Sequence, residues 1–158
     1  MQQDLEAIVD GAVGGAGATV VMSGVMAAAK RAGLLGEQPP KLISRQALHA
    51  VGIHNSGEET ENALAVVAHL SFGTGIGALF AVLHRRLHLP VNPAAHGIVF
   101  ASLIWAASYK GWLPAMGTMP SPEHDRPGRP ATMVVSHWVY GATLGALVSR
   151  RLAARLAR

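Results

Sequence analysis

The stretch that decides the fold reads Val134-Val135-Ser136-His137-Trp138-Val139-Tyr140-Gly141-Ala142-Thr143-Leu144-Gly145-Ala146-Leu147. Sixty-eight residues earlier the chain reads Val66-Val67-Ala68-His69-Leu70-Ser71-Phe72-Gly73-Thr74-Gly75-Ile76-Gly77-Ala78-Leu79. Both copies follow the pattern V-V-x-H-x-x-[FY]-G-x-x-x-G-A-L. Each copy lies in an apolar run that is long enough to cross a bilayer. The two stretches therefore predict a repeated membrane helix.

The composition is that of a membrane protein with one domain covering residues 1–158. Half of the residues are hydrophobic and 14% are charged, against roughly 25% charged residues in ordinary soluble domains. The formal net charge is +4, but the cations lie at the predicted helix ends, where they suit lipid headgroups. No Lys/Arg stripe alternates with aromatic residues, so nucleic acid is not an expected partner. The chain has no cysteine, which excludes disulfides and thiolate chemistry.

We predict an all-α fold, a bundle of four transmembrane helices. The predicted spans cover about residues 11–29, 62–83, 93–109 and 131–149. The first ten residues carry three acidic residues and no Lys or Arg. A secretory signal needs a positive start, so we expect the first apolar run to be retained as a span.

A short amphipathic helix is expected between spans one and two. Pro39-Pro40 suits a first helical turn, and apolar residues then recur at helical spacing up to Val51. Ser56 followed by Glu59 is typical of a capping box that begins the next helix. A metal site formed by His49, His54, Glu58 and Glu61 is the less favoured interpretation. We expect these residues to cap the helix or to face solvent. We expect no metal ligands and no catalytic residues.

The similarity extends from the single helix to a helix pair. Ala27-Ala28-Ala29-Lys30 resembles Ala107-Ser108-Tyr109-Lys110, an alignment that sets Gly17 on Gly97. A helix pair followed by a second helix pair restores the original direction. The sequence thus predicts two hairpins that form a parallel repeat about an axis along the membrane normal. The arginines of the short turn and of the basic tail favour cytoplasmic termini.

The repeated motif predicts one functional face on each of spans two and four. At helical spacing, His69 shares a face with Gly73 and Gly77, and His137 shares a face with Gly141 and Gly145. The G-x-x-x-G spacings allow close approach of a partner backbone. Ionisable residues within a membrane suggest function by default, so His69 and His137 are the candidate intramembrane polar pair.

Three roles for the two histidines stay open. Each ring could donate a hydrogen bond that fixes helix packing. The pair could instead line a polar path or act as a proton-sensitive switch. As a third alternative, the rings could be axial ligands of a b-type haem, with the nearby glycines making room for it; otherwise no cofactor is expected.

No enzyme motif is present. The sequence contains no H-E-x-x-H, no phosphate-binding loop followed by Lys-Ser/Thr and no intramembrane carboxylate. We therefore predict a non-enzymatic membrane protein, an accessory or stress-related component, with a small channel or transporter as the alternative. Four short glycine-rich helices enclose little by themselves, so the expected partners are the lipid bilayer and further subunits, as a homo-oligomer or a larger complex.

The layout resembles the YagU-like family of small bacterial inner-membrane proteins. The resemblance lies in Pro39-Pro40 with Arg45 downstream, Ala68-His69, Gly117-Thr118-Met119-Pro120 and Ser136-His137-Trp138. It covers most of the chain from about Pro39. It implies a bacterial inner-membrane location and a link to acid tolerance.

Overall fold

The computed structural model describes residues 2–87 and 90–157, and within them the chain forms helices and no strand. The elements are α1 (Gln2–Arg31), α2 (Pro39–Ala50), α3 (Glu58–Leu87), α4 (Pro93–Trp105), the π-helix η1 (Ala106–Trp112), α5 (Leu113–Ala115), the 3-10 helix η2 (Pro122–His124) and α6 (Arg129–Leu156). The predicted all-α class is confirmed, and the amphipathic segment that begins at Pro39-Pro40 is the helix α2.

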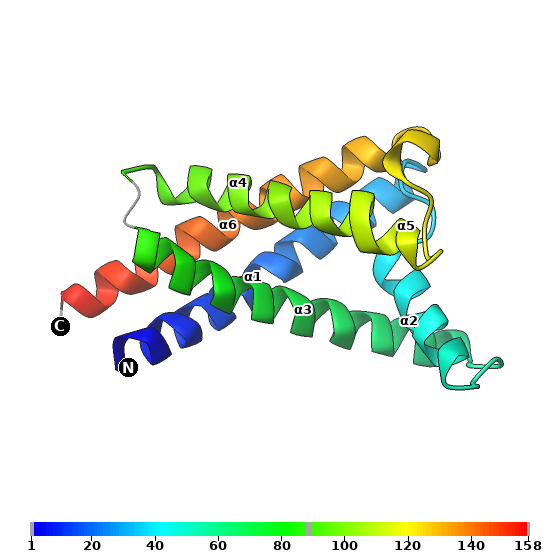
Figure 1. The fold of residues 1–158 in the computed structure, drawn as a ribbon, viewed down its shortest axis with the longest axis horizontal. Helices are drawn as coiled ribbons and strands as arrows, with labels where there is room; N and C mark the ends of the chain where they lie inside the picture. The colour runs from blue at the N-terminus through cyan, green and yellow to red at the C-terminus, as the bar shows by residue number, and fades with distance from the viewer. Residues whose placement is uncertain (1, 88–89, 158) are drawn as a thin grey trace.

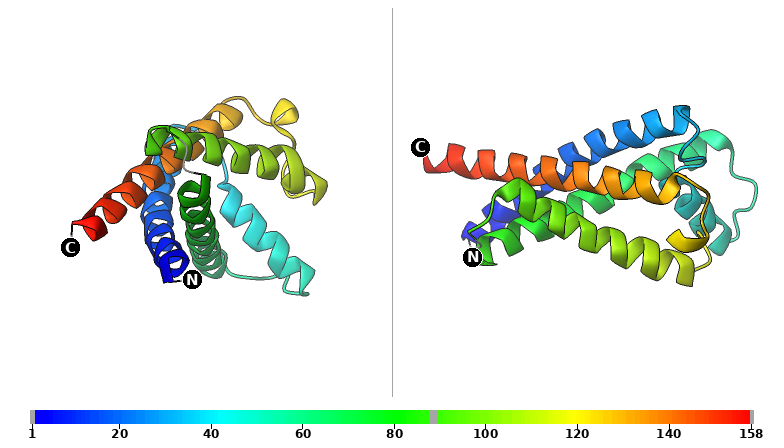
Figure 2. Two further views of the ribbon diagram at one scale, coloured as in Figure 1. Left: turned by 60° about the vertical axis from the view of Figure 1, so that its left-hand side comes forward. Right: turned by 90° about the horizontal axis from the view of Figure 1, so that it is seen from above.

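The long helices form two packed pairs (Figure 1). α1 lies along α3, α4 lies along α6, and the pairs join where α1 and α6 pack against each other. α3 and α4 are close at the short turn that links them and separate toward the opposite end, as the two further views also show (Figure 2). α2 packs against α3 at that opposite end. Both termini lie at the end with the short turn.

Three helices are long and apolar enough to cross a membrane: α1, α3 and residues Arg129–Arg155 of α6. The predicted third span instead begins as the 13-residue α4 and widens into the 7-residue η1. Within η1, the Ser108 hydroxyl donates hydrogen bonds of 2.8 and 3.1 Å to the carbonyls of Ile104 and Trp105. Such a bond offers helix carbonyls an alternative partner to the backbone N–H groups, and it accompanies the widening here.

Glycines allow the two helices of each pair to approach each other closely. A methyl group on Gly77 would overlap the carbonyl of Gly11, and one on Gly15 would overlap the carbonyl of Gly73. In the second pair, a methyl group on Gly97 would overlap the carbonyl of Gly141. Gly145 likewise meets the backbone of Pro93 and Ala94. The predicted G-x-x-x-G faces are thus backbone contact surfaces.

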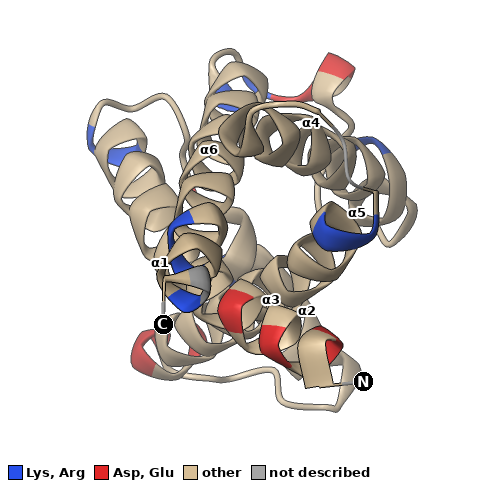
Figure 3. Ribbon diagram, turned by 90° about the vertical axis from the view of Figure 1, so that its left-hand side faces the viewer, with Lys and Arg blue, Asp and Glu red and all other residues tan. Residues whose placement is uncertain are grey.

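Charged residues hold the helix ends together at both ends of the molecule. At the end with the termini (Figure 3), the buried Asp10 of α1 accepts hydrogen bonds of 2.8 Å from Arg151 and 2.7 Å from Arg155 of α6. At the other end, Arg129 of α6 donates a 2.9 Å bond to the carbonyl of Leu35 and pairs with Asp125 at 3.1 Å.

One arginine fastens α2 to α3. Arg45 pairs with Glu37 before α2 and with Glu61 of α3, each at 2.8 Å. The hydrogen bonds that Arg45 donates to the carboxylates of Glu61 and Glu37 raise the pKa of its guanidinium above the ordinary value. Ser56 donates to Glu61 at 3.2 Å, so the acidic partner of this serine is Glu61, where the sequence predicted Glu59. The same carboxylate therefore serves the helix start and the attachment of α2.

Candidate functional site

The candidate site is an apolar cavity of about 240 Å³ between the two helix pairs. α1, α3, α6, the α4–η1 helix and the first turn of α2 all contribute to its wall. Most of the lining side chains are apolar, among them Met22, Met26, Ile43, Phe72, Ile104 and Met133. The polar side chains of the wall are Thr19, His69, Ser108, His137 and Tyr140. An enclosed apolar surface with few polar groups is the ordinary character of a small-molecule site.

His137 presents a defined chemical group to this cavity. Its Nδ1 lies 2.8 Å from the carbonyl oxygen of Met133, one turn earlier on α6. A carbonyl can only accept, so Nδ1 carries the hydrogen of this bond, and in the neutral ring Nε2 is left as an acceptor. Nε2 is therefore the ring nitrogen that His137, as a residue of the cavity wall, has left to offer as a hydrogen-bond acceptor or metal ligand.

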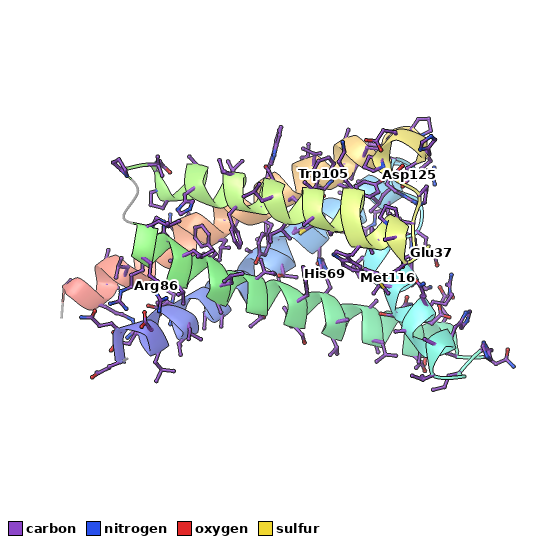
Figure 4. All side chains as sticks on the ribbon, in the orientation of Figure 1. Glu37, His69, Arg86, Trp105, Met116 and Asp125 are labelled. Carbon is purple, nitrogen blue, oxygen red and sulfur yellow. The ribbon has the colours of Figure 1, made fainter. Side chains whose placement is uncertain are left out.

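His69 belongs to the other helix pair, α1 and α3, and is fixed by a residue of α1. It lies about halfway along α3 (Figure 4), and its Nδ1 is 3.2 Å from the hydroxyl oxygen of Ser23 on α1. A hydroxyl can donate or accept, so either tautomer of this ring satisfies the bond. In both tautomers, Nδ1 is engaged with α1 and Nε2 is the remaining ring nitrogen. The structure therefore brings the two sequence-predicted histidines to one cavity, each fixed through Nδ1.

Tyr140 joins the two helix pairs beside the histidines. Its hydroxyl donates a 2.7 Å hydrogen bond to the carbonyl of Gly73 on α3. Thr19 donates a 2.7 Å bond to the carbonyl of Gly15 within α1. Both hydroxyl hydrogens are thus used inside the protein, so these two groups can offer only acceptor lone pairs to an occupant. The cross-helix role of Tyr140 was not predicted, although the Phe/Tyr position of the repeated motif marks the residue.

The cavity opens beside α3. Ala68 and Phe72 both line it, and both are exposed at the surface of the chain. The same cavity is lined from α4, η1 and α5 by Ile104, Trp112 and Leu113, a segment that diverges from α3 (Figure 1). An apolar molecule could thus reach the cavity from the side of the bundle, between the helices, and not only from a helix end.

The glycine faces do not meet one another. Gly73 and Gly77 pack on α1, whereas Gly141 and Gly145 pack on α4. α3 and α6 meet at the level of the histidines through side chains such as Tyr140. α1 contacts both α3 and α6. Because the backbone of α1 packs on the glycines of α3, α6 does not pack there.

A second histidine pair lies between the first residues of α4 and the last turn of α3. The Nδ1 atoms of His84 and His96 are 2.7 Å apart, and both rings contact Phe80. Sequence reasoning did not single out this pair, because the two rings lie on different helices. In the part of the chain that the structure describes, no three His, Cys, Asp or Glu residues gather as metal ligands. Glu58 and Glu61, weighed as ligands, pair with Lys41 and Arg45.

The fold and this cavity define the class: an all-helical protein whose three longest helices are apolar enough to cross a membrane and enclose an apolar cavity. The chain belongs to DUF6789, a family of unknown function, whose model matches residues 5–157. No curated protein and no solved structure matches the chain. The resemblance to the YagU-like family stays a prediction.

Proposed function

We propose that this chain is a non-enzymatic, multi-pass protein of the bacterial inner membrane that holds an apolar molecule between its helices, as an accessory or stress-related component. The observation that carries the proposal is the apolar cavity with His69 and His137 in its wall. An ionisable ring in an apolar, membrane-buried wall is costly unless it serves an interaction. His137 offers an acceptor through Nε2, so the occupant we propose carries a hydrogen-bond donor, such as a hydroxyl group, on an apolar body.

The proposed topology has four spans. α1, α3 and α6 each satisfy the length requirement. α4 continues directly into η1, and together the two approach the roughly 20 residues that a span needs. Both termini then lie on one side (Figure 1), for which we propose the cytoplasm because the arginines of the last turns of α3 and α6 gather there. Large apolar side chains remain exposed along α1 and α3, which supports lipid or further subunits as neighbours.

The proposed architecture is a parallel repeat of two hairpins. Gly73 and Gly77 correspond to Gly141 and Gly145 by the 68-residue offset of the motif. Their partners Gly11 and Gly15 occupy the places that Pro93 and Gly97 occupy in the second pair. In this frame Gly97 corresponds to Gly15, two residues before the Gly17 that the sequence alignment selected.

The proposal can be tested by blocking the cavity. We expect organic extracts of the purified protein to contain an apolar compound, detected by mass spectrometry, that is depleted at least tenfold in Ala68→Trp and His137→Leu. Ala68 is exposed and lines the cavity, so a larger side chain fills it without disturbing buried packing. Ala63→Trp is the matched control, because Ala63 is exposed on the same helix and lines neither cavity. Equal extracts from all four proteins would contradict the proposal.

A histidine-lined path is the second candidate function. His69 lines both the apolar cavity and a second cavity, of about 360 Å³, that reaches Lys30 and Lys41 at the helix ends. A titratable ring in a wall shared by two cavities is suited to passing a proton or a small polar solute. Proton or ion flux in liposomes that His69→Ala and His137→Ala abolish would support this function. Absence of flux in the parent protein would exclude it.

Haem is the remaining occupant to test. Metal-ligating histidines usually donate their second ring N–H to a carbonyl or similar acceptor, as His137 does to Met133. His69 and His137 are the residues that would hold the haem iron, which would supply electron-transfer chemistry when bound. An absorbance spectrum of the purified protein decides the case, because a b-type haem gives a Soret band and a hydroxyl-bearing apolar compound gives none.

A further inference from the structure

The second cavity adjoins the histidine cavity, with Thr19 and His69 in both walls, and extends into the angle between α1, α2 and α3. Its volume is about 360 Å³. One part of its wall is polar, with Lys30, Gln38, Lys41 and Asn62. The rest of the wall includes the apolar residues Val20, Ala65, Val66 and Leu70.

The polar and apolar parts are separated along the helix axes. On α1, Lys30 is ten residues from Val20, which at 1.5 Å per residue is roughly 15 Å of helix. On the antiparallel α3, Asn62 precedes Leu70 by eight residues, or roughly 12 Å. The two helices run in opposite directions, so both place their polar residue at the same end. The cavity therefore changes from charged to apolar over a length comparable to an acyl chain.

The charge at the polar end is positive and accessible. Lys30 is exposed, and its ammonium makes no ion pair in the described structure. Lys41 pairs with Glu58 at 2.8 Å, and 12% of the Lys41 side chain and 79% of the Glu58 side chain are exposed. The carboxylate is the solvent-facing partner, so it can exchange for another anion. Two ammonium groups and the amides of Gln38 and Asn62 can thus face one anion, with Glu58 and Glu61 as the nearby carboxylates.

The apolar part is open to the outside of the bundle. Val20 and Val66 are 65% and 66% exposed, and Leu70 is 39% exposed. The polar groups at this depth satisfy one another, since Ser23 is bonded to His69 and Thr19 to the carbonyl of Gly15. The floor of the groove therefore presents apolar surface to whatever lies in it.

We propose that this groove binds one anionic phospholipid. Its phosphate lies between Lys30 and Lys41, within reach of Gln38 and Asn62, and one acyl chain lies along Val20, Val66 and Leu70. Basic pockets at the membrane surface between spanning helices recognise acidic lipid headgroups in this way. The inference rests on the proposed membrane location, but it does not depend on the occupant of the histidine cavity.

The test measures lipid retention by native mass spectrometry after reconstitution with phosphatidylglycerol or phosphatidylcholine. We expect the parent protein to retain phosphatidylglycerol at least tenfold better than phosphatidylcholine. Lys30→Gln should lower that preference about threefold, and Lys30→Gln with Lys41→Gln should abolish it. Lys110→Gln is the matched control, since Lys110 is an exposed lysine at the end of η1 that pairs with Glu123 and lines neither cavity.

Three outcomes would overturn the lipid site. The preference could survive the double variant, or Lys110→Gln could reduce it equally, which would indicate diffuse charge attraction. Glycerol phosphate could displace the lipid at equal concentration, which would show that the apolar part contributes nothing. Recovery of the expressed protein in the soluble fraction, in contrast, would contradict the membrane location itself, so the two failures are distinguishable.

Discussion

Both helix pairs pack backbone against backbone at their glycines, but they differ in how far the neighbouring motif side chains are exposed. Around the motif of α3, Ala68 is exposed and Phe72 is 50% exposed. The matching residues of α6, Ser136 and Tyr140, are 0% and 5% exposed. α6 is packed against both α1 and α4, whereas α3 is packed mainly against α1 and α2. The same motif thus forms the centre of the bundle in one pair and the open wall of a cavity in the other.

The largest effect should come from the glycines, which the two pairs have in common. We predict that Gly77→Ala and Gly145→Ala each lower the free energy of unfolding by about 3 kcal/mol, because a methyl group would overlap the backbone of the partner helix. Denaturation in detergent, followed by circular dichroism, measures it.

Gly75 supplies the control for both glycine variants. It lies on the same helix as Gly77 with no neighbouring atom within 4 Å of an added methyl group. Gly75→Ala should be neutral or stabilising by up to about 1 kcal/mol, since alanine is the better helix former. A large loss for Gly77→Ala with none for Gly145→Ala would break the likeness of the two pairs.

The second-largest loss of stability should come from Asp10, a residue by which the two helix pairs differ. Asp10 of α1 is buried and binds Arg151 and Arg155, whereas Asn92, at the corresponding position before α4, accepts a bond from the backbone N–H of Ala94. We predict that Asp10→Asn lowers the free energy of unfolding by about 2 kcal/mol, because it removes charge-assisted bonds at a buried carboxylate. Thermal unfolding in detergent measures the change.

Asp4 provides the comparison for that variant. Its pairs with Arg85 and Arg86 are 3.5 Å long, and 40% of its side chain is exposed. Asp4→Asn should therefore change the free energy of unfolding by less than about 0.5 kcal/mol. Equal losses for both variants would mean that the burial of Asp10 does not strengthen its ion pairs with Arg151 and Arg155.

Exchanging tyrosine and phenylalanine between the two copies of the motif should lower the free energy of unfolding in one copy only, and by a smaller amount. Tyr140→Phe removes the bond to the Gly73 carbonyl, so we predict a loss of about 1 kcal/mol in the free energy of unfolding. Phe72→Tyr makes the reverse change at an exposed position and should be neutral. Chemical denaturation of both variants measures the difference, and a loss in Phe72→Tyr as large as in Tyr140→Phe would contradict the asymmetry.

The smallest effect should be at Ser136. Its hydroxyl oxygen is buried without a hydrogen-bond partner, and the first copy of the motif has alanine, Ala68, at that position. Ser136→Ala should thus leave stability unchanged or raise it by up to about 1 kcal/mol. Ala68→Ser, at the exposed position, should have no measurable effect on the same thermal unfolding curve. A clear loss in Ser136→Ala would reveal a partner for the hydroxyl.

Much of the helical structure could be predicted from local pattern. Apolar runs predicted α1, α3 and α6, and Pro39-Pro40 predicted the start of α2. The third span was harder, because the widening into η1 depends on how Ser108 bonds to its own helix. The sequence pattern singled out Gly17 in α1, whereas the glycines of this helix that meet the facing backbone are Gly11 and Gly15.

The candidate site was predicted in part. His69 and His137 were selected as polar groups in apolar helices, and both line one cavity. The sequence predicted that the glycines beside them accept a partner backbone, but not that the partners are α1 and α4. The pairing of His84 with His96 and the bond from Tyr140 to Gly73 each join two different helices, so no pattern within one helix could reveal them.

By itself, the sequence determined that the chain is helical, where the long helices run, and which faces can approach closely. Those properties follow from apolar periodicity and from the absence of side chains on glycine. Only the tertiary structure decided which helix occupies each glycine face, and hence that α6 is enclosed while α3 borders an open cavity. The two copies of the motif have the same local preferences, so their different exposure arises from their neighbours: α6 lies between α1 and α4, and α4 diverges from α3.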